Sequence, residues 1–304
     1  MNVNRTKSAT TATWPKRIVE WVEENTAYLS VPFTWNLPAA YQRCIWYKSE
    51  GYQVKAGGPA VSLMPSFLAD VAEIGGKVDA LTRHNPNAVF TSRGCIRSCS
   101  FCAVPKIEGA LVELTDWQPR PIVCDNNLLA CSRAHFGQVI DRLKPLAGID
   151  FNQGLDAQLL QPYHIDRLRE LKLSVVRLAW DNVKAESIVI DSVNALLAAG
   201  FSARKIRVYV LVNFQDTPDD ALYRCERLKA MNIFPWPQRY NPLDTLKKNS
   251  YLAPGWNEEW LRAFLRYWSR QNWLKYVPFA EYTRRGRNRL DGLVPPYLMR
   301  FNNA

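Results

Sequence analysis

The stretch Ser92-Arg-Gly-Cys-Ile-Arg-Ser-Cys-Ser-Phe-Cys102 sets three cysteines at the spacing C-x3-C-x2-C. Thiolates this close together on one loop can hold a single iron–sulfur cluster, and a cluster of four irons ordinarily takes four protein ligands. No fourth cysteine lies in the stretch, so one iron would stay open to another ligand. The sequence therefore predicts a [4Fe-4S] cluster held by Cys95, Cys99 and Cys102.

Zinc and disulfide bonds are the alternatives for these cysteines. A structural zinc site needs four nitrogen or sulfur ligands and a catalytic site three, but His84, His135 and His164 all lie outside the usual short spacing. The odd count of seven cysteines and the absence of an export signal disfavour a disulfide framework. The other four cysteines are scattered and are predicted to be small buried side chains, with a second iron–sulfur cluster as the alternative. These are Cys44, Cys124, Cys131 and Cys225.

With Phe101 directly before Cys102 and a strand-like run over residues 87–93, the pattern resembles the radical S-adenosylmethionine (radical SAM) superfamily. The resemblance implies that S-adenosylmethionine binds the open iron through its amino and carboxylate groups. An electron from an external donor, flavodoxin or ferredoxin-like, would then release methionine and a 5′-deoxyadenosyl radical that abstracts hydrogen from the substrate. The protein would supply orientation and exclude water.

From about residue 88 the chain alternates strands and helices, which is typical of parallel βα units. Six units are too few for a closed barrel of eight strands. The sequence predicts an α/β fold: a partial (βα)6 TIM-type barrel with a small N-terminal α/β extension and a C-terminal helical and basic segment. Its active-site groups would lie at the carboxyl ends of the strands. The predicted strands after residues 87–93 are 121–125, 148–152, 174–179, 207–212 and 233–240, and the main helices are 137–143, 163–171, 185–199 and 219–231.

Three domains are predicted: the N-terminal extension over residues 1–87, the core over 88–245 and the C-terminal extension over 246–304. The N-terminal extension resembles a degenerate cobalamin-binding-like domain. The Asp-x-His-x-x-Gly signature is absent, so we predict no cobalamin. Within this extension we expect a strand end at 28–35, a helix at 37–50, a strand at 52–56 and a helix reaching about 74.

Polar residues at the strand ends are the candidate cofactor-binding residues. Asp125-Asn126-Asn127 lies where the superfamily binds the cofactor ammonium, although it departs from the usual Gly-Gly-Glu form, and an Asx turn is the alternative. The resemblance implies further contacts after the next three strands, where ordinary loop structure is the alternative. A buried Arg177 would need an anionic partner, either the cofactor carboxylate or a neighbouring aspartate. The full set is Phe101, Asp125, Asn126, Asn127, Asn152, Gln153, Asp156, Arg177, Asp181 and Leu211.

The net charge of +11 and the isoelectric point of about 9.4 favour a polyanionic partner such as DNA or RNA, although many basic enzymes bind no nucleic acid. A helix predicted over 255–275 carries aromatic residues on one side and arginines on another. These arginines either contact nucleic acid or lie in solvent on a helix that seals the barrel. The candidate nucleic-acid-binding residues are Arg262, Arg266, Arg270, Arg284, Arg285, Arg287 and Arg289.

The composition predicts a globular, cytoplasmic protein without a membrane partner. Hydrophobic residues make up 47% and charged residues 22% of the chain, and no run approaches the roughly 18 apolar residues of a membrane span. The leading hypothesis is a radical SAM enzyme acting on a nucleic-acid base or its substituent; one version is a phage-type thymidine hypermodification. The alternatives are a radical SAM enzyme acting on a small metabolite or peptide, and a nucleic-acid-binding protein with a structural metal.

Overall fold

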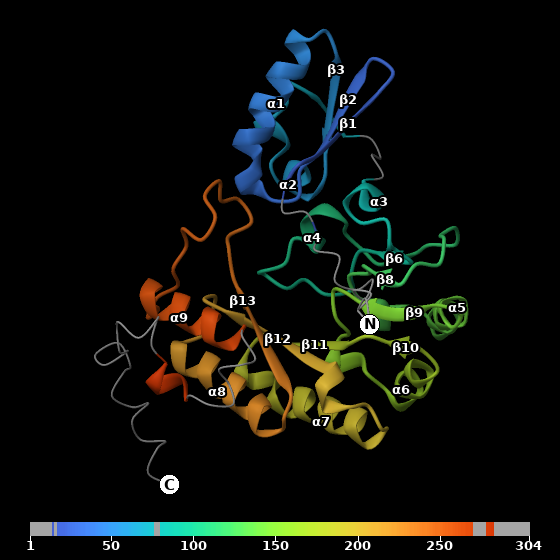
Figure 1. Ribbon diagram of the computed structural model, residues 1–304, viewed down its shortest axis with the longest axis vertical. Coiled ribbons are helices and arrows are strands. Elements are labelled where there is room, and N and C mark those ends of the chain that lie inside the picture. The colour runs from blue at the N-terminus through green and yellow to red at the C-terminus, as the bar shows by residue number, and fades with distance from the viewer. Residues whose placement is uncertain (1–13, 15–16, 76–79, 270–277, 283–304) are drawn as a thin grey trace, which may run out of the picture. The chain divides into compact units, whose positions relative to one another are not determined.

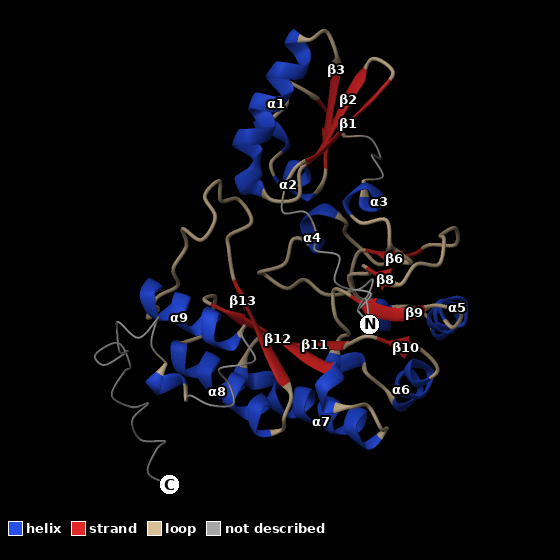
Figure 2. Cartoon of the chain, viewed as in Figure 1, coloured by secondary structure: helices blue, strands red, loops and turns tan. Residues whose placement is uncertain are grey.

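The computed structural model describes residues 14, 17–75, 80–269 and 278–282 of the chain (Figure 1). These residues form an α/β protein whose helices and strands are distinguished in Figure 2. The chain divides into two compact units: unit 1 takes Met1–Gly154, Asp166–Val175 and Asn241–Ser250, and unit 2 takes Leu155–Ile165, Val176–Tyr240 and Tyr251–Ala304. This division falls inside the core predicted over residues 88–245. The predicted domain boundaries remain predictions.

The N-terminal part of unit 1 is a four-stranded sheet with its own apolar core. Alternation along the strands buries Ala27 and Leu29 on the same face as Val54 and Ala56, and helix α1 packs against that sheet (Figure 1). The strands run in the order β1-β2-β3-β4, with β1 antiparallel to β2 and the other pairs parallel. The elements are β1 (Val19–Glu23), β2 (Thr26–Ser30), α1 (Leu37–Ser49), β3 (Gln53–Gly57), α2 (Pro59–Leu63) and β4 (Glu73–Ile74).

The prediction of a helix reaching about residue 74 was wrong. Helix α2 ends at Leu63, because Pro65 disfavours a helical conformation in the residue before it, and Met64 has φ −135° and ψ 62°. Glu73 and Ile74 instead form strand β4, which pairs with Lys55 and Ala56. The predicted helix at 37–50 and strand at 52–56 are confirmed as α1 and β3.

A second sheet of unit 1 carries the first three predicted core strands. Its four strands are all parallel and run in the order β10-β9-β8-β5. A two-stranded antiparallel pair, β6-β7, lies beside the cysteine stretch in the sequence. The elements are α3 (Leu81–His84), β5 (Ala88–Val89), β6 (Ser92–Arg93), α4 (Val104–Ile107), β7 (Val112–Glu113), β8 (Ile122–Val123), α5 (Arg133–Leu143), β9 (Ala147–Phe151), α6 (Pro162–Arg169) and β10 (Lys172–Leu173).

Unit 2 contains the last three predicted strands in one parallel sheet. Alternation along β12 buries Val208 and Val210 on the face where α7 and α8 pack (Figure 1). Pro235 and Pro237 lack an N–H donor, which suits the edge position of β13 in the order β11-β12-β13. The elements are β11 (Val176–Trp180), α7 (Glu186–Ala198), β12 (Ile206–Val212), α8 (Pro218–Ala230), β13 (Phe234–Arg239) and α9 (Glu258–Trp268).

The α/β class and all six predicted core strands are therefore observed, as three parallel strands in each unit. Closure of these strands into one partial TIM-type barrel remains a prediction. In the described part of the chain, no helix has the length and apolar character needed to cross a membrane.

Candidate functional site

The three cysteines of the motif lie on one loop of unit 1, between β6 and α4. Each is partly exposed, and none of the chain's seven cysteines, all of them described, is in a disulfide. Gly94 starts the loop with φ +74°, and a side chain there would overlap the carbonyl of Ala110, so only glycine fits. The backbone N–H of Cys95 then donates to the Gly109 carbonyl at 3.1 Å. The loop therefore leaves β6 along a defined path.

Several N–H groups point at the cysteine sulfurs. The backbone N–H of Arg97 donates to Cys95 Sγ at 3.4 Å, and that of Val104 donates to Cys102 Sγ at 3.5 Å. The side-chain amide of Asn127 also donates to Cys95 Sγ, at 3.6 Å. N–H donors stabilise negative charge on sulfur and tune the reduction potential of iron–sulfur clusters. The surroundings of these sulfurs suit metal-bound thiolates.

The side chains do not form a ready-made metal cage. Among the described residues, no three His, Cys, Asp or Glu side chains converge closely enough to hold a metal ion. The fit to a cluster therefore depends on the type of ligand atoms. These are three cysteine sulfurs on one loop that begins at a glycine, and two of the sulfurs accept hydrogen bonds from N–H groups.

Glu108 is a residue of the site that the sequence analysis missed. Its carboxylate accepts two hydrogen bonds from the Arg93 guanidinium, at 2.8 and 2.9 Å, and one from the backbone N–H of Gly94 at 3.0 Å. It also accepts from Asn126 Nδ2 at 2.6 Å. Its side chain is only 12% exposed. Residues 93–112 contain one acidic residue, Glu108, and three Lys or Arg residues. This composition predicts an ion pair of Glu108, but it does not identify which cation is the partner.

Asp125 anchors the residues just before the loop. Its buried carboxylate accepts from the backbone N–H of Thr91 at 2.6 Å, from the Thr91 hydroxyl, and from the Ser92 hydroxyl at 2.9 Å. Burial raises the pKa of Asp125, and these hydrogen bonds oppose that shift. Asn127 precedes a short 3-10 turn without capping it, so the structure does not use that side chain as the predicted turn cap. Asp125, Asn126 and Asn127 thus each touch the cysteine loop or the residues that brace it.

The candidates after β9 have mostly local roles. A hydrogen bond from the Asn152 side chain opposes the burial that raises the pKa of Cys124. Gln153 is exposed. Asp156 accepts from the backbone N–H of Gln158 at 3.0 Å and caps the 3-10 turn Ala157–Leu159. Asp156 therefore caps a local turn, and its contact with the cofactor remains a prediction.

The candidates on β11 and β12 belong to unit 2. Arg177 is half-buried and donates to the Tyr209 hydroxyl at 2.9 Å. The anionic partner expected for Arg177 from the sequence remains a prediction. Leu211 is half-buried on the same sheet face, two residues beyond Tyr209. Burial raises the pKa of Asp181, while Arg224 lowers it and Asp156 raises it further.

Arg224 is the second residue that the sequence analysis missed. It is fully buried on α8, and its guanidinium donates to the Trp180 carbonyl at 2.7 Å and to Asp216 Oδ2 at 2.5 Å. Trp180 ends β11 directly before Asp181, so this ion pair holds the strand end that carries a candidate residue. The sequence signal was an arginine on the helix face that also carries Ala221, Cys225 and Leu228.

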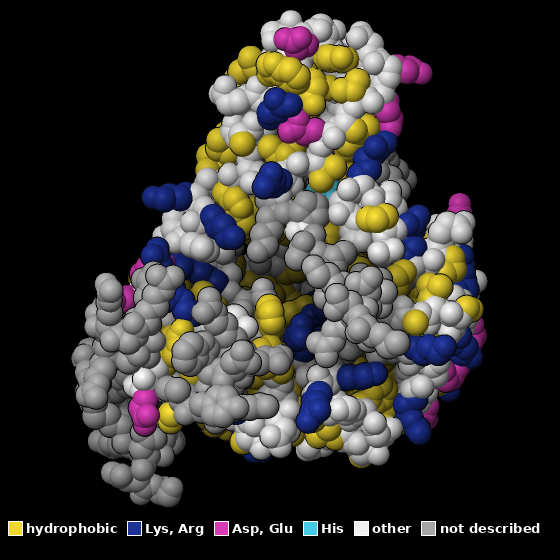
Figure 3. Space-filling view, viewed as in Figure 1, with side chains coloured by type: hydrophobic (Ala, Val, Ile, Leu, Met, Phe, Trp, Pro, Cys, Tyr) yellow, Lys and Arg dark blue, Asp and Glu magenta, His cyan; other side chains and the backbone are white. Residues whose placement is uncertain are grey.

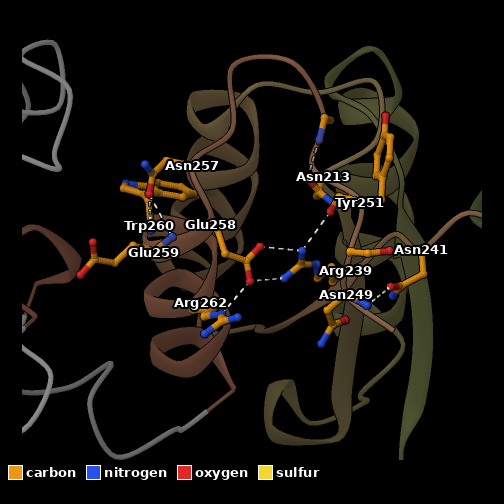
Figure 4. A network of polar contacts seen from close by, with 12 residues as sticks. Asn213, Arg239, Asn241, Asn249, Tyr251, Asn257, Glu258, Glu259, Trp260 and Arg262 are labelled. Atoms are coloured by element: carbon orange, nitrogen blue, oxygen red, sulfur yellow. Dashed lines mark hydrogen bonds and ion pairs between the residues drawn. The ribbon is translucent and has the colours of Figure 1, made fainter. Parts of the chain in front are cut away.

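A polar network ties the chain before α9 to the ends of β12 and β13 (Figure 4). The Tyr251 carbonyl accepts from Arg239 Nη2 at 2.9 Å and from Asn213 Nδ2 at 3.2 Å. Arg239 also pairs with Glu258, at 2.7 and 3.0 Å. Asn213 has φ +65° and is fully buried, which suits a fixed corner rather than a mobile ligand contact.

The candidate nucleic-acid-binding arginines fall partly on α9. Arg262 is 67% exposed and pairs with Glu258, which neutralises part of its charge. Arg266 is half-buried on the same helix. Helix α9 begins at Glu258 rather than at the predicted residue 255, and residues 270–275 of the predicted helix lie outside the described residues. The other candidates lie outside the described residues: Arg270, Arg284, Arg285, Arg287 and Arg289.

The remaining cysteines are buried, as predicted. Burial raises the pKa of Cys44 and of Cys131 to about 11 and that of Cys124 to about 12. Burial also raises the pKa of Cys225 well above its ordinary value. Thiols with such pKa values stay protonated near neutral pH and are poor nucleophiles and metal ligands.

No protein-family model matches this chain, and no curated protein matches it either. The function therefore has to be inferred from the residues of the site.

Proposed function

We propose that the chain is a radical SAM enzyme whose Cys95, Cys99 and Cys102 hold a [4Fe-4S] cluster. One observation carries the proposal: the C-x3-C-x2-C loop begins at a position only glycine can occupy and presents sulfurs that accept N–H hydrogen bonds. The cysteines of this loop are partly exposed. They are therefore better suited to act as thiolate ligands than the four buried cysteines of the chain. S-adenosylmethionine is the proposed ligand of the open iron.

The chain's own residues would hold this site in place. Bound together, a [4Fe-4S] cluster and S-adenosylmethionine supply one-electron cleavage of a carbon–sulfur bond and hydrogen abstraction from an unactivated carbon. Glu108 fixes Gly94 at the start of the loop, and Asp125 fixes Ser92 just before it. Asn126 lies next to the loop through Glu108, and its amide oxygen would accept from the cofactor ammonium. The electron would come from an external flavodoxin or ferredoxin-like donor.

The proposed substrate is a base of DNA or RNA, or a substituent on that base. The net charge of +11 supports a polyanionic partner. Dark blue Lys and Arg side chains are spread over the face in Figure 3, with acidic side chains among them, so this face shows no single dominant basic patch. A small metabolite or peptide is the second candidate substrate, for which the charge would be incidental.

Anaerobic reconstitution tests the chemistry. The wild-type protein should take up iron and sulfide and, after dithionite and S-adenosylmethionine are added, release 5′-deoxyadenosine. Cys99→Ala should abolish that release, while Cys44→Ala, which removes a buried thiol of helix α1, should retain it. A tetrahedral zinc site without iron-dependent absorption, or equal product from Cys99→Ala, would overturn the proposal and favour a nucleic-acid-binding protein with a structural metal.

Mass spectrometry of nucleosides tests the substrate. DNA and RNA from cells that express the protein should contain a modified nucleoside that is lost with the Cys99→Ala variant. Unchanged nucleosides, together with active cleavage of S-adenosylmethionine, would instead favour the small-molecule or peptide substrate.

A further inference from the structure

Two aromatic side chains of unit 1 stack on each other just after β2. The rings of Phe33 and Trp35 have centroids 4.6 Å apart and planes 9° apart. Phe33 is 39% exposed and Trp35 is half-buried. Thr34, between them, is buried. The two stacked rings therefore lie at the surface, and the buried side chain of Thr34 holds the backbone between them in place.

A lysine-bearing turn of the same unit lies against this pair. The Lys248 ammonium lies 5.6 Å from the centre of the Trp35 ring, and the Thr34 hydroxyl donates to the Thr245 carbonyl at 2.6 Å. Lys247 and Lys248 are both exposed. Within the described residues, neither lysine forms an ion pair with a carboxylate. Their charges are therefore available to an outside partner.

The turn is held in shape by its own hydrogen bonds. The Lys247 carbonyl accepts from the Ser250 hydroxyl at 2.7 Å and from the Thr245 hydroxyl at 3.0 Å. The backbone N–H of Asn249 donates to Asn241 Oδ1 at 2.7 Å, and Asn249 has φ +58°. A turn ordered in this way presents its two lysines without a large ordering cost on binding.

We propose that Phe33, Trp35, Lys247 and Lys248, the aromatic–lysine surface, bind a single strand of nucleic acid. A base would stack on the exposed Phe33 ring, and the two ammonium groups would contact adjacent phosphates. Proteins that hold single strands combine stacking side chains with cations that follow the backbone. The inference rests on the proposed nucleic-acid substrate and names where unit 1 holds that substrate.

The composition of the surface favours nucleic acid over a protein partner. Lysine is depleted from the cores of protein–protein interfaces, yet two lysines flank this aromatic pair. Asp244 is the one acidic residue of the 241–250 segment, and residues 33–36 carry no charge. The exposed Trp46 on α1 offers a contrast. Its overlying cation, Arg43, is 4.4 Å from the ring but is paired with Glu20 at 2.8 Å.

Fluorescence anisotropy with a labelled oligothymidylate tests the stacking contact in the full chain. Phe33→Leu should weaken binding about ten-fold or more, since base–aromatic stacking contributes on that scale. Phe33→Tyr should restore it, because a tyrosine ring stacks as well. Trp46→Ala, which removes an exposed ring elsewhere in unit 1, should leave binding unchanged. Equal affinity of Phe33→Leu, Phe33→Tyr and wild type would overturn the inference.

The salt dependence of binding tests the phosphate contacts. The double variant Lys247→Ala/Lys248→Ala should reduce the slope of log affinity against log salt by about 1.4, that is about 0.7 for each lost phosphate contact to a single strand. The double variant Lys172→Ala/Lys184→Ala, which removes two exposed lysines elsewhere, is the matched control and should change the slope less. A Lys247→Ala/Lys248→Ala variant with the wild-type slope would contradict the proposed contacts.

These outcomes separate the surface from the enzyme. Thermal unfolding confirms that each variant is folded, and both lysines and Phe33 are exposed enough to be replaced without loss of the core. Wild-type binding that no variant weakens would overturn the surface and leave the nucleic-acid substrate in place. If the wild-type protein binds no oligonucleotide, the aromatic–lysine surface and the nucleic-acid substrate are both overturned. The release of 5′-deoxyadenosine still tests the cluster chemistry separately. A shift in sedimentation on Phe33→Leu would indicate a contact between copies of the chain instead.

Discussion

At the scale of single residues, Asn127 gives the sharpest test of the cysteine loop. It is 4% exposed, and its amide N–H donates to Cys95 Sγ. Donors to sulfur stabilise the reduced, more negative cluster. Asn127→Ala should therefore lower the reduction potential of the reconstituted cluster by about 40 mV, which corresponds to roughly 1 kcal/mol per hydrogen bond. A redox titration followed by electron paramagnetic resonance measures this shift.

The neighbouring Asn126 supplies the control, because its amide donates to Glu108 and not to a sulfur. Asn126→Ala should leave the potential close to that of the wild type. Equal shifts in both variants would show that the effect comes from general loosening of this strand end.

Glu108 should govern how firmly the loop keeps iron. Glu108→Gln weakens the pair with Arg93 and the bonds to Gly94 and Asn126. The reconstituted variant should lose iron to a chelator several times faster than the wild type. Because Arg93 is 41% exposed, the stability change should be small, within about 1 kcal/mol. Glu113→Gln, a more exposed acid that contacts Ser132, should keep the wild-type rate; a faster loss there too would remove the special role of Glu108.

The raised pKa values of the buried thiols, together with the exposure of the loop cysteines, predict an order of alkylation. Thiolate is the reacting form, and the raised pKa of Cys124, about 12, leaves very little thiolate at pH 8. Cys95, Cys99 and Cys102 are partly exposed, so iodoacetamide should label them first in the metal-free, folded protein. Raising the pH toward 11 should increase labelling of Cys44 and Cys131. Peptide mass spectrometry reads the order, and early labelling of Cys124 would contradict it.

At the scale of elements, α8 carries the buried pair that holds the end of β11. Removing one partner of a buried ion pair leaves an uncompensated charge or polar group, which costs about 3–5 kcal/mol. Arg224→Ala should therefore lower the free energy of unfolding by that amount in a urea titration. Arg227→Ala, on the same helix, removes only an exposed pair with Glu186 and should cost less than about 1 kcal/mol. If both variants lose a similar free energy of unfolding, the buried pair contributes no more to stability than the exposed one.

The elements themselves were largely predictable from the sequence. Apolar runs predicted all six core strands, and helical periodicity placed α7 and α8 to within one residue at each end. Strand β1 was missed because its polar residues, Glu20 and Glu23, interrupt the apolar pattern of an edge strand. Strand β4 has two residues and forms only through its register with β3, which no local pattern encodes.

The site was predictable only where its residues are close in sequence. The cysteine spacing is local, and the polar strand end that begins at Asp125 contacts the cysteine loop through Asn127 and Cys95. The partners were not predictable, because Asp125 and Thr91 are 34 residues apart and are joined by the pairing of β5 with β8. Glu108 and Arg224 act through contacts of the same nonlocal kind.

At the scale of the whole molecule, the charge of +11 leads to a test of the C-terminal arginines. Arg284, Arg285, Arg287 and Arg289 lie outside the described residues, and their contact with nucleic acid is still a prediction. Replacing all four with alanine lowers the net charge by four. If each contacts a phosphate of a single strand, the slope of log affinity against log salt should fall by about 2.8.

The size of that fall separates contact from general attraction. Charges that act only through the overall electrostatic field steer association and are screened by salt. Their loss should slow binding, but it should not reduce the number of counterions that phosphate contacts release and that sets the slope. A variant with four arginines replaced elsewhere on the surface, Arg17, Arg169, Arg204 and Arg227, all exposed, carries the same net charge and isolates that general term. A larger fall in slope for the C-terminal variant than for this control would assign phosphate contacts to the C-terminal residues. Equal slopes in the two variants would remove them from the nucleic-acid interface and leave the aromatic–lysine surface to be judged alone.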